Sequence, residues 1–190
     1  MAEHQMKSLT ALAGTEPHLD QFEGLTIREN PDVAMASLAC RTGRDKDLAK
    51  SVKGLTGFAL PVPGQMASKG DWAAFWTGPG QWMITAAPYG AHEAIAAKVK
   101  STVGDAGSVT EQSDGWVRFE LEGPRTVAML ERLCAVDTVK MGAGTATRCQ
   151  IEHLGSFLLC HEAQARYSLL TLRSGAASMH HALTTAAKSL

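Results

Sequence analysis

The sequence lacks the features that mark membrane, nucleic-acid-binding and secreted proteins. Its 190 residues contain no apolar run long enough to span a bilayer. The 18 basic and 19 acidic residues leave a formal net charge of -1 and form no basic block. An acid and an amide near the start are untypical of a signal peptide. The four cysteines are scattered without a CxxC pair, which favours reduced thiols. We therefore expect a cytoplasmic protein that binds neither nucleic acid nor membrane.

Common catalytic motifs are also missing. The sequence has no GxSxG nucleophile elbow, no GxxxxGK[ST] phosphate loop, no HExxH zinc helix and no GxGxxG turn between a strand and a helix. Gly142 and Gly144 form a lone GxG, which a loop between a helix and a strand explains. These patterns predict no catalytic residue, identify no cofactor-binding residue, and leave open whether the chain is an enzyme.

Cysteines and histidines in the last quarter of the chain have the chemistry for zinc but a poor arrangement. Cys149, His153, Cys160 and His161 are zinc-ligand types, yet residues 160 and 161 would point to opposite faces of one strand. Ordinary buried thiols explain the cysteines better, so we predict no metal site. His180 falls on the apolar side of the last predicted helix, where a core or interface histidine is commoner than a ligand.

Hydrophobic periodicity predicts an α+β protein made of two similar halves. Strands are expected at 33–40, 72–76, 81–86, 108–112, 116–123, 145–153, 155–160 and 166–173, and helices at 44–55, 91–104, 123–134 and 174–190. Both halves end in a strand, a glycine-marked break and an Ala-rich amphipathic helix, which indicates a duplication. We expect an arm over 1–24 and two subdomains, 25–104 and 105–190, in one compact unit. Each subdomain would be an antiparallel sheet with helices on one face.

Several polar residues have a simple structural interpretation. Glu111, Ser113 and Asp114 lie in a Ser-Asp-Gly turn before a strand, which is favoured over an acid–base role. Gly123 precedes Pro124, which we place at the first helical position, where a missing N–H costs nothing. In the strand before them, odd-numbered apolar residues alternate with polar ones, which predicts one buried face and one wet face.

Two arginines lie in or beside apolar strands. Arg148 and Arg173 are expected to be buried, and a buried arginine normally pairs with a carboxylate. Glu152 and Glu120 are the candidate partners. A structural ion pair is favoured over anion binding for both arginines.

Four stretches taken together resemble the gamma subunit of bacterial heterotetrameric sarcosine oxidase. They are WTGPGQWMI at 76–84 and the segments 110–137, 144–155 and 167–183. The family is related to the folate-binding aminomethyltransferase-like domains, including the T-protein of the glycine cleavage system. The resemblance therefore implies an aminomethyltransferase-like fold. It marks the following residues as family signature or structural positions: Gly78, Pro79, Trp82, Ser113, Gly123, Pro124, Arg148 and Arg173.

This resemblance implies a place in a complex with alpha, beta and delta subunits. Such a complex oxidises sarcosine to glycine and hydrogen peroxide and passes the one-carbon unit to tetrahydrofolate. The resemblance assigns FAD, FMN, NAD and zinc to the partner subunits, and an accessory role in assembly to this chain. Trp76 and Trp82 would be cross-strand neighbours in a Gly-Pro-Gly hairpin, with Trp82 in the core. Trp72 and Trp76 belong either to the core or, with His180, to a candidate partner interface.

The sequence departs from the T-protein pattern at the position of its acidic pair. Leu158 and Leu159 stand there, and neither side chain accepts a proton. The DxSH pattern of the T-protein becomes EQSD at 111–114, and Arg173 stands near the usual Asn. These changes predict a relative without catalytic activity of its own. The alternatives are an independent folate-binding or aminomethyltransferase-like protein, or a stand-alone binding module unrelated to amine oxidation.

Overall fold

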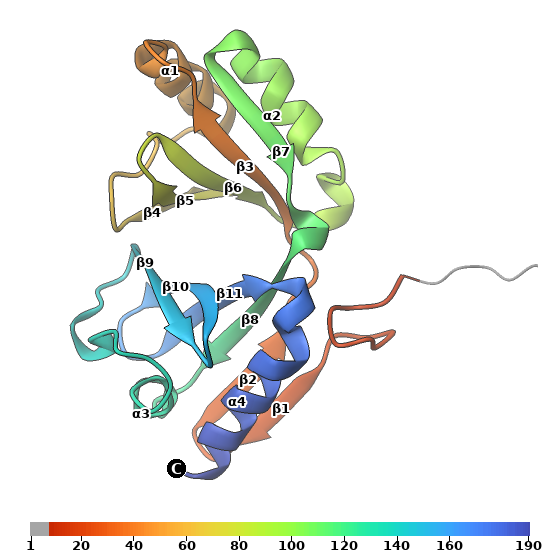
Figure 1. Cartoon of the computed structure of the whole chain (residues 1–190), viewed down its shortest axis with the longest axis vertical. Helices are drawn as coiled ribbons and strands as arrows, with labels where there is room; N and C mark the ends of the chain where they lie inside the picture. Colours follow the sequence, from red (N-terminus) through yellow and green to blue (C-terminus); the bar gives the residue numbers. More distant parts are fainter. Residues whose placement is uncertain (1–7) are drawn as a thin grey trace, which may run out of the picture.

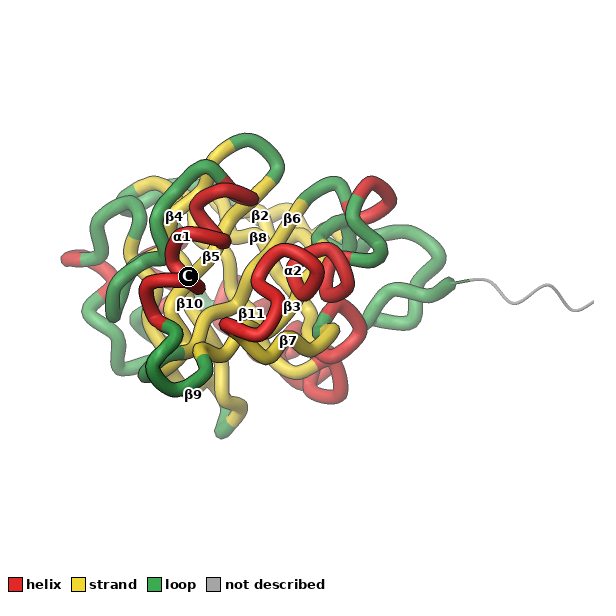
Figure 2. Tube along the Cα trace, turned by 90° about the horizontal axis from the view of Figure 1, so that it is seen from above, coloured by secondary structure: helices red, strands yellow, loops and turns green. Residues whose placement is uncertain are grey.

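Two antiparallel sheets lie face to face in the computed structural model, which describes residues 8–190 (Figure 1). The first sheet has the order β4-β5-β6-β3-β7. Its strands are β3 (Ala34–Cys40), β4 (Met66–Lys69), β5 (Trp72–Gly78), β6 (Gln81–Ala86) and β7 (Gly107–Glu111). Helices α1 (Asp45–Thr56) and α2 (Ile95–Val103) lie against its outer side, as the view from above also shows (Figure 2).

The second sheet has the order β1-β2-β8-β11-β10-β9. Its strands are β1 (Leu19–Phe22), β2 (Leu25–Glu29), β8 (Trp116–Glu122), β9 (Thr145–Ile151), β10 (Leu154–Glu162) and β11 (Arg166–Leu172). The short helix α3 (Thr126–Leu130) and the longer α4 (Ala176–Lys188) cover its outer side. Short 3-10 turns occur at Tyr89–Ala91, Gly104–Ala106, Ser113–Gly115, Thr138–Lys140 and Arg173–Gly175.

Strand alternation divides the buried apolar residues into three clusters. On β8, the side chains of Val117, Phe119 and Leu121 pack toward Met179 and Leu183 of α4. The first sheet forms an equivalent cluster with α1 and α2. A third cluster lies between the sheets and contains residues of both, among them Val33, Met35, Phe75, Met83, Ala146, Phe157, Leu159 and Leu170. The order of layers is therefore helix, sheet, sheet, helix, which confirms the predicted α+β class with helices on one face of each sheet.

Most of the expected elements are present, with four local corrections. Strand β4 lies in the segment 58–70, where no strand or helix is predicted, and residues 19–22 of the expected arm form β1. Helix α3 is much shorter than 123–134 and begins after Pro124, so this proline is not its first residue. The β9–β10 turn lies at Glu152 and His153, where φ is positive, and not at 154–155. These corrections concern turns and the ends of elements, where the same residue types occur in turns and in short strands.

The sheets exchange strands across the expected boundary at 104/105. Strand β2 lies in the first half of the sequence but pairs with β8, whereas β7 lies in the second half but pairs with β3. The second sheet therefore contains β1 and β2 from the first half, and the first sheet contains β7 from the second half. The division into 25–104 and 105–190 stays a prediction about the repeat in the sequence.

Gly123 is required by a close approach of two backbone segments. Its φ is +124°, and a Cβ added there would lie 2.4 Å from the carbonyl oxygen of Gly24. The turn between β1 and β2 therefore packs directly on the end of β8. Because L-residues rarely adopt this φ and a side chain would collide with backbone, only glycine fits.

Candidate functional site

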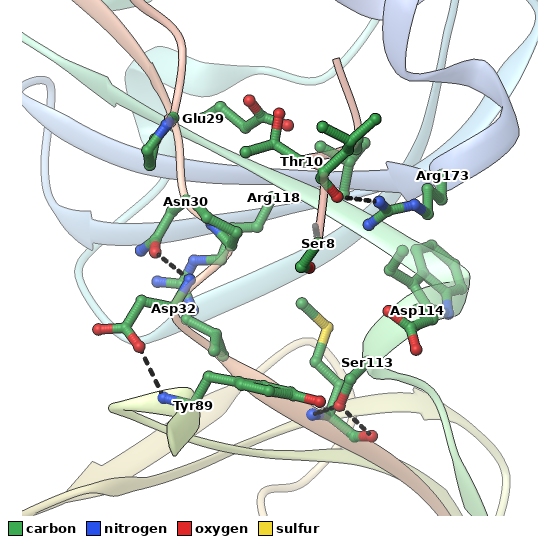
Figure 3. Close-up of a pocket in the computed structure, with 18 of the residues that line it drawn as sticks. Ser8, Thr10, Glu29, Asn30, Asp32, Tyr89, Ser113, Asp114, Arg118 and Arg173 are labelled. Atoms are coloured by element: carbon green, nitrogen blue, oxygen red, sulfur yellow. Dashed lines mark hydrogen bonds between the residues drawn. The ribbon is translucent and has the colours of Figure 1, made fainter. Parts of the chain in front are cut away.

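A cavity of about 380 Å³ lies where the N-terminal segment crosses the edges of both sheets (Figure 3). Its walls come from residues 8–17, the β2–β3 connection, the 3-10 turns at 89–91 and 113–115, and β8. Asp32 Oδ1 accepts a hydrogen bond from the backbone N–H of Tyr89 at 2.7 Å. Arg173 Nη2 donates to the carbonyl oxygen of Leu9 at 2.7 Å and so holds the N-terminal segment in place. The walls are thus tied together by bonds between segments distant in sequence.

A second cavity, of about 220 Å³, lies between the sheets and shares Asn30, Val33 and Arg118 with the first. Its remaining walls come from β4, β5 and β6 on one side and from Leu159 and His161 of β10 on the other. Arg118 therefore stands at the partition between two adjacent hollows. It is the one strongly basic side chain that both cavities share within residues 8–190.

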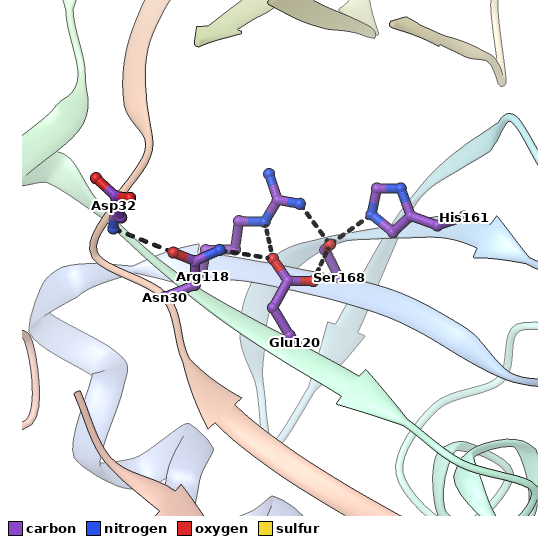
Figure 4. A network of polar contacts seen from close by, with 6 residues as sticks. All are labelled: Asn30, Asp32, Arg118, Glu120, His161 and Ser168. Atoms are coloured by element: carbon purple, nitrogen blue, oxygen red, sulfur yellow. Dashed lines mark hydrogen bonds and ion pairs between the residues drawn. The ribbon is translucent and has the colours of Figure 1, made fainter. Parts of the chain in front are cut away.

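Arg118 belongs to a buried polar network on the inner face of the second sheet (Figure 4). Its Nε donates to Glu120 Oε1 at 2.6 Å, and its Nη2 donates to Ser168 Oγ at 2.9 Å. Ser168 Oγ donates to Glu120 Oε2 at 2.7 Å, and Asn30 Nδ2 donates to Glu120 Oε1 at 3.0 Å. The geometry follows from the strands, because residues 118 and 120 share one face of β8 and Ser168 lies directly opposite Glu120.

The prediction that one face of β8 is exposed to water is therefore wrong. Glu120 is only 7% exposed, because the first sheet covers this face. Hydrogen bonds within the network replace those that the carboxylate would form with water. Burial opposes ionisation of Glu120, but the charge of Arg118 and hydrogen bonds from Ser168, Asn30 and Arg118 outweigh it. Together they hold the pKa of Glu120 below its ordinary value. The glutamate is thus a carboxylate at neutral pH, paired with the arginine beside it.

His161 extends this network as a neutral imidazole. Burial lowers the pKa of His161 to about 4, with Arg118 and Arg166 acting in the same direction and Glu120 opposing them. Its Nε2 lies 2.5 Å from Ser168 Oγ. Because the Ser168 hydroxyl donates to Glu120, the imidazole Nε2–H must donate to Ser168 Oγ. The other nitrogen, Nδ1, is then an acceptor.

These contacts leave Arg118 with unused hydrogen-bonding capacity. Within residues 8–190 its Nη1 forms no hydrogen bond or ion pair, and Figure 4 shows it pointing away from Glu120 and Ser168. A guanidinium held rigid by two neighbours and open at its third nitrogen is suited to a carboxylate or another planar anion. With the acceptor of His161 in the same cavity wall, the site is equipped for binding and orientation.

The arginines predicted from sequence lie elsewhere. Arg148 is exposed on the edge strand β9, and Arg173 is half-buried against the N-terminal segment. Within the described residues neither forms the expected ion pair with Glu152 or Glu120. The physical reason is position, because Arg148 lies on the edge strand three strands from β8, Arg173 bonds to Leu9, and Glu120 is paired with Arg118 two residues away on the same face. The alternation of β8 places Arg118 and Glu120 on one face of the strand, but the same pattern is typical of a face exposed to solvent.

The tryptophan hairpin forms as predicted. Gly78 and Pro79 lie at the turn, and Trp76 is directly opposite Trp82 on the neighbouring strand. Trp82 packs against the helix-side cluster, and its Nε1 donates to the carbonyl oxygen of Pro61 at 2.8 Å. Trp72 packs against the same cluster and meets the edge of His92, with ring centroids 5.1 Å apart. Trp76 is half-buried on the same face by alternation.

Other predicted positions have structural surroundings. Ser113 Oγ accepts from the Met35 backbone N–H at 2.9 Å and donates to Glu111 at 2.6 Å, which agrees with the expected turn chemistry. His180 contacts Asp20 within the chain, at 2.7 Å. Cys160 is part of the helix-side core, whereas His161 faces the network, so the expected opposite orientation of residues 160 and 161 is confirmed.

Comparisons with known proteins find likeness in structure. Neither a family model nor a curated relative matches the sequence. A heterotetrameric sarcosine oxidase from Corynebacterium sp. U-96, in complex with pyrrole 2-carboxylate, matches with a TM-score of 0.75 and 22% identity over 87% of this chain and 84% of that chain. The glycine cleavage system aminomethyltransferase T of Bartonella henselae matches with a TM-score of 0.59 and 14% identity over 82% of this chain. The chain shares the fold of both proteins. It spans 44% of the aminomethyltransferase, less than half of its length.

Within the part of the chain that the structure describes, no helix is long and apolar enough to cross a membrane.

Proposed function

We propose that this chain is the accessory gamma subunit of a sarcosine oxidase-type flavoenzyme complex. The observation that carries the proposal is the shared fold, which covers nearly equal parts of the two chains, 87% and 84%. Nearly equal shares mean that the two chains have similar lengths, which supports assignment to a subunit of this size. The four sequence stretches that resemble the gamma family point to the same assignment.

The proposal gives the chain a supporting role. Leu158 and Leu159, at the place of the T-protein's acidic pair, are 0% and 2% exposed and pack into two different apolar clusters. A carboxylate at position 158 would be buried in the helix-side apolar cluster, and neither leucine can accept a proton, so methylene transfer to tetrahydrofolate is assigned to another chain. In this proposal the flavins FAD and FMN, NAD and zinc are held by the alpha, beta and delta partners.

Trp76 is the aromatic residue best placed to meet a partner. It lies on the helix side of the first sheet, whereas α2 contacts β3 and β7, which are two and three strands away from β5. Trp72 and Trp82 are engaged by their own chain, through His92 and through Pro61. A half-buried tryptophan beyond the cover of the helices is typical of an interface centre.

The test is co-expression of the tagged chain with the neighbouring reading frames of its own genome. The proposal expects a yellow assembly with three further chains and sarcosine-dependent peroxide formation. Trp76→Arg is expected to weaken capture of these chains by more than about tenfold, since interface anchors often contribute this much. Val139→Arg is the control, because Val139 is an exposed apolar residue in the 3-10 turn at Thr138–Lys140, outside the hairpin, and receives the same charged side chain.

A colourless single chain would contradict this proposal and direct attention to the alternative. An independent folate-binding or aminomethyltransferase-like protein is favoured by one observation, the open nitrogen of Arg118 in a cavity, since folates carry carboxylates. Titration of the isolated chain with tetrahydrofolate, compared with Arg118→Lys, tests this alternative. Saturable binding that the lysine variant loses would establish it.

A further inference from the structure

Three potential metal ligands that do not line the cavities described above meet at the edge of the second sheet. They are His18, Asp20 in β1 and His180 in α4, and their ligating atoms all lie within 4.8 Å of one another. His180 Nε2 is 2.7 Å from Asp20 Oδ2, and His18 Nε2 is 3.4 Å from Asp20 Oδ1. The two imidazoles thus lie near different oxygens of one carboxylate.

The fold holds these side chains in position. Residues 18 and 20 are two apart in extended chain, so their side chains emerge on one face, toward α4. The ring of His180 stacks on the buried ring of Phe119, with centroids 6.3 Å apart and an interplanar angle of 24°. The backbone N–H of His18 donates to Glu29 Oε2 at 3.2 Å. Position and orientation are therefore set by contacts outside the triad, as in built metal sites.

Distances and exposure within the triad suit a small divalent cation. Bond lengths of about 2.0–2.2 Å to nitrogen and oxygen place two ligands of a tetrahedral zinc ion roughly 3.4 Å apart. The N–O separations are 2.7 Å at Asp20 Oδ2 and 3.4 Å at Asp20 Oδ1, and one ligand atom from each residue lies within 4.8 Å of the others. Side-chain rotation must bring both imidazole nitrogens and one carboxylate oxygen to the spacing that the ion requires. His18 is half exposed and the other two side chains are 23% exposed, so ions have access and one coordination position is open to water.

We propose that His18, Asp20 and His180 form a binding site for a divalent transition-metal ion of the zinc type. The two imidazoles supply Nε2 and the aspartate supplies one oxygen, which is the usual ligand chemistry for this class of ion. The ion joins the N-terminal segment and β1 to α4, residues 160 positions apart in sequence. The sequence alone does not reveal this site, because His180 lies 160 positions from Asp20 along the chain.

Metal titration of the full-length chain tests the site, with Co²⁺ as a spectroscopic probe and Zn²⁺ in competition. The expected result is one equivalent bound, with visible cobalt bands typical of nitrogen and oxygen ligands and a rise in Tm on adding Zn²⁺. His180→Ala and His18→Ala are each expected to weaken binding by more than about tenfold. His181→Ala is the matched control, because His181 is exposed on the same helix and lies outside the triad.

Two outcomes would overturn the proposal. One is equal affinity in the wild-type, His18→Ala and Asp20→Asn proteins, which would leave the triad as a hydrogen-bonded group without an ion. The other is cobalt bound with intense thiolate bands that Cys134→Ser removes, which would place the ion at the cysteines. His18→Ala and Asp20→Asn keep the test valid if His180→Ala fails to fold, because both positions lie at the edge of the sheet.

Discussion

Replacement of Glu120 by glutamine removes the charge from the centre of the polar network with almost no change of shape. In the wild-type protein this carboxylate accepts hydrogen bonds from Arg118, Asn30 and Ser168 and is 7% exposed. Glutamine can still accept from Arg118, but its amide group then faces Ser168, whose hydroxyl loses its acceptor. The guanidinium stays buried between the sheets without a counter-charge.

Loss of one partner from a buried ion pair typically costs about 3–5 kcal/mol. For a chain of this size, each kcal/mol shifts Tm by about 2–4 °C, so we expect a fall of about 6–20 °C. Differential scanning calorimetry measures this fall, and urea unfolding gives the free energy independently. Glu122→Gln is the matched control, because Glu122 lies on the same strand but is exposed, and its loss is expected to be below about 0.5 kcal/mol.

The effect should also depend on pH in a defined direction. The pKa of Glu120 is lowered in the folded protein, so the unfolded chain binds a proton first as pH falls. The stability contributed by Glu120 is therefore fully present above its ordinary pKa of 4.5 and is lost as pH falls through the folded value. The difference between wild type and Glu120→Gln should accordingly shrink below pH 4.5.

A double replacement distinguishes the charge from the packing. Removal of both partners, in Arg118→Met with Glu120→Leu, leaves no unpaired charge and is expected to recover much of the lost stability. A loss of less than about 1 kcal/mol in Glu120→Gln, or a double variant no better than the single one, would refute the assignment of a buried, mutually dependent pair.

Two further predictions concern other features of the structure. Gly123→Ala should destabilise the protein by about 3 kcal/mol, because its Cβ would meet the Gly24 carbonyl oxygen in a conformation that L-residues avoid. Gly142→Ala, with open space around it, should be nearly neutral in the same thermal unfolding measurement, and equal losses would contradict the steric argument. A hydrogen bond from Cys149 lowers the pKa of Cys134 to about 6, so alkylation of Cys134 should reach half its maximal rate near that pH. Cys149→Ser keeps a hydrogen-bond donor at this position and should leave the midpoint lowered, whereas Cys149→Ala should raise it toward 9.0. An unchanged midpoint in the alanine variant would count against the hydrogen bond.

Local patterns were sufficient for much of the fold. The alternation of Val117, Phe119 and Leu121 places three residues in one core, and the Gly-Pro-Gly turn places Trp76 opposite Trp82. These features depend on residues close together in sequence, where strand and turn geometry permit few arrangements. For the same reason, the α+β class and the helices on one face of each sheet followed from the order and period of the elements.

Only the tertiary structure decided what covers each face. The polar face of β8 carries the same pattern whether it meets water or a second sheet, so sequence could not show that Arg118 and Glu120 are buried together. The exchange of β2 and β7 between the sheets, and the meeting of Asp20 with His180, are likewise invisible along the chain. Periodicity records which residues share a face of one element. Contacts between elements depend on the packing of the whole chain, and the candidate sites of this protein are formed by those contacts.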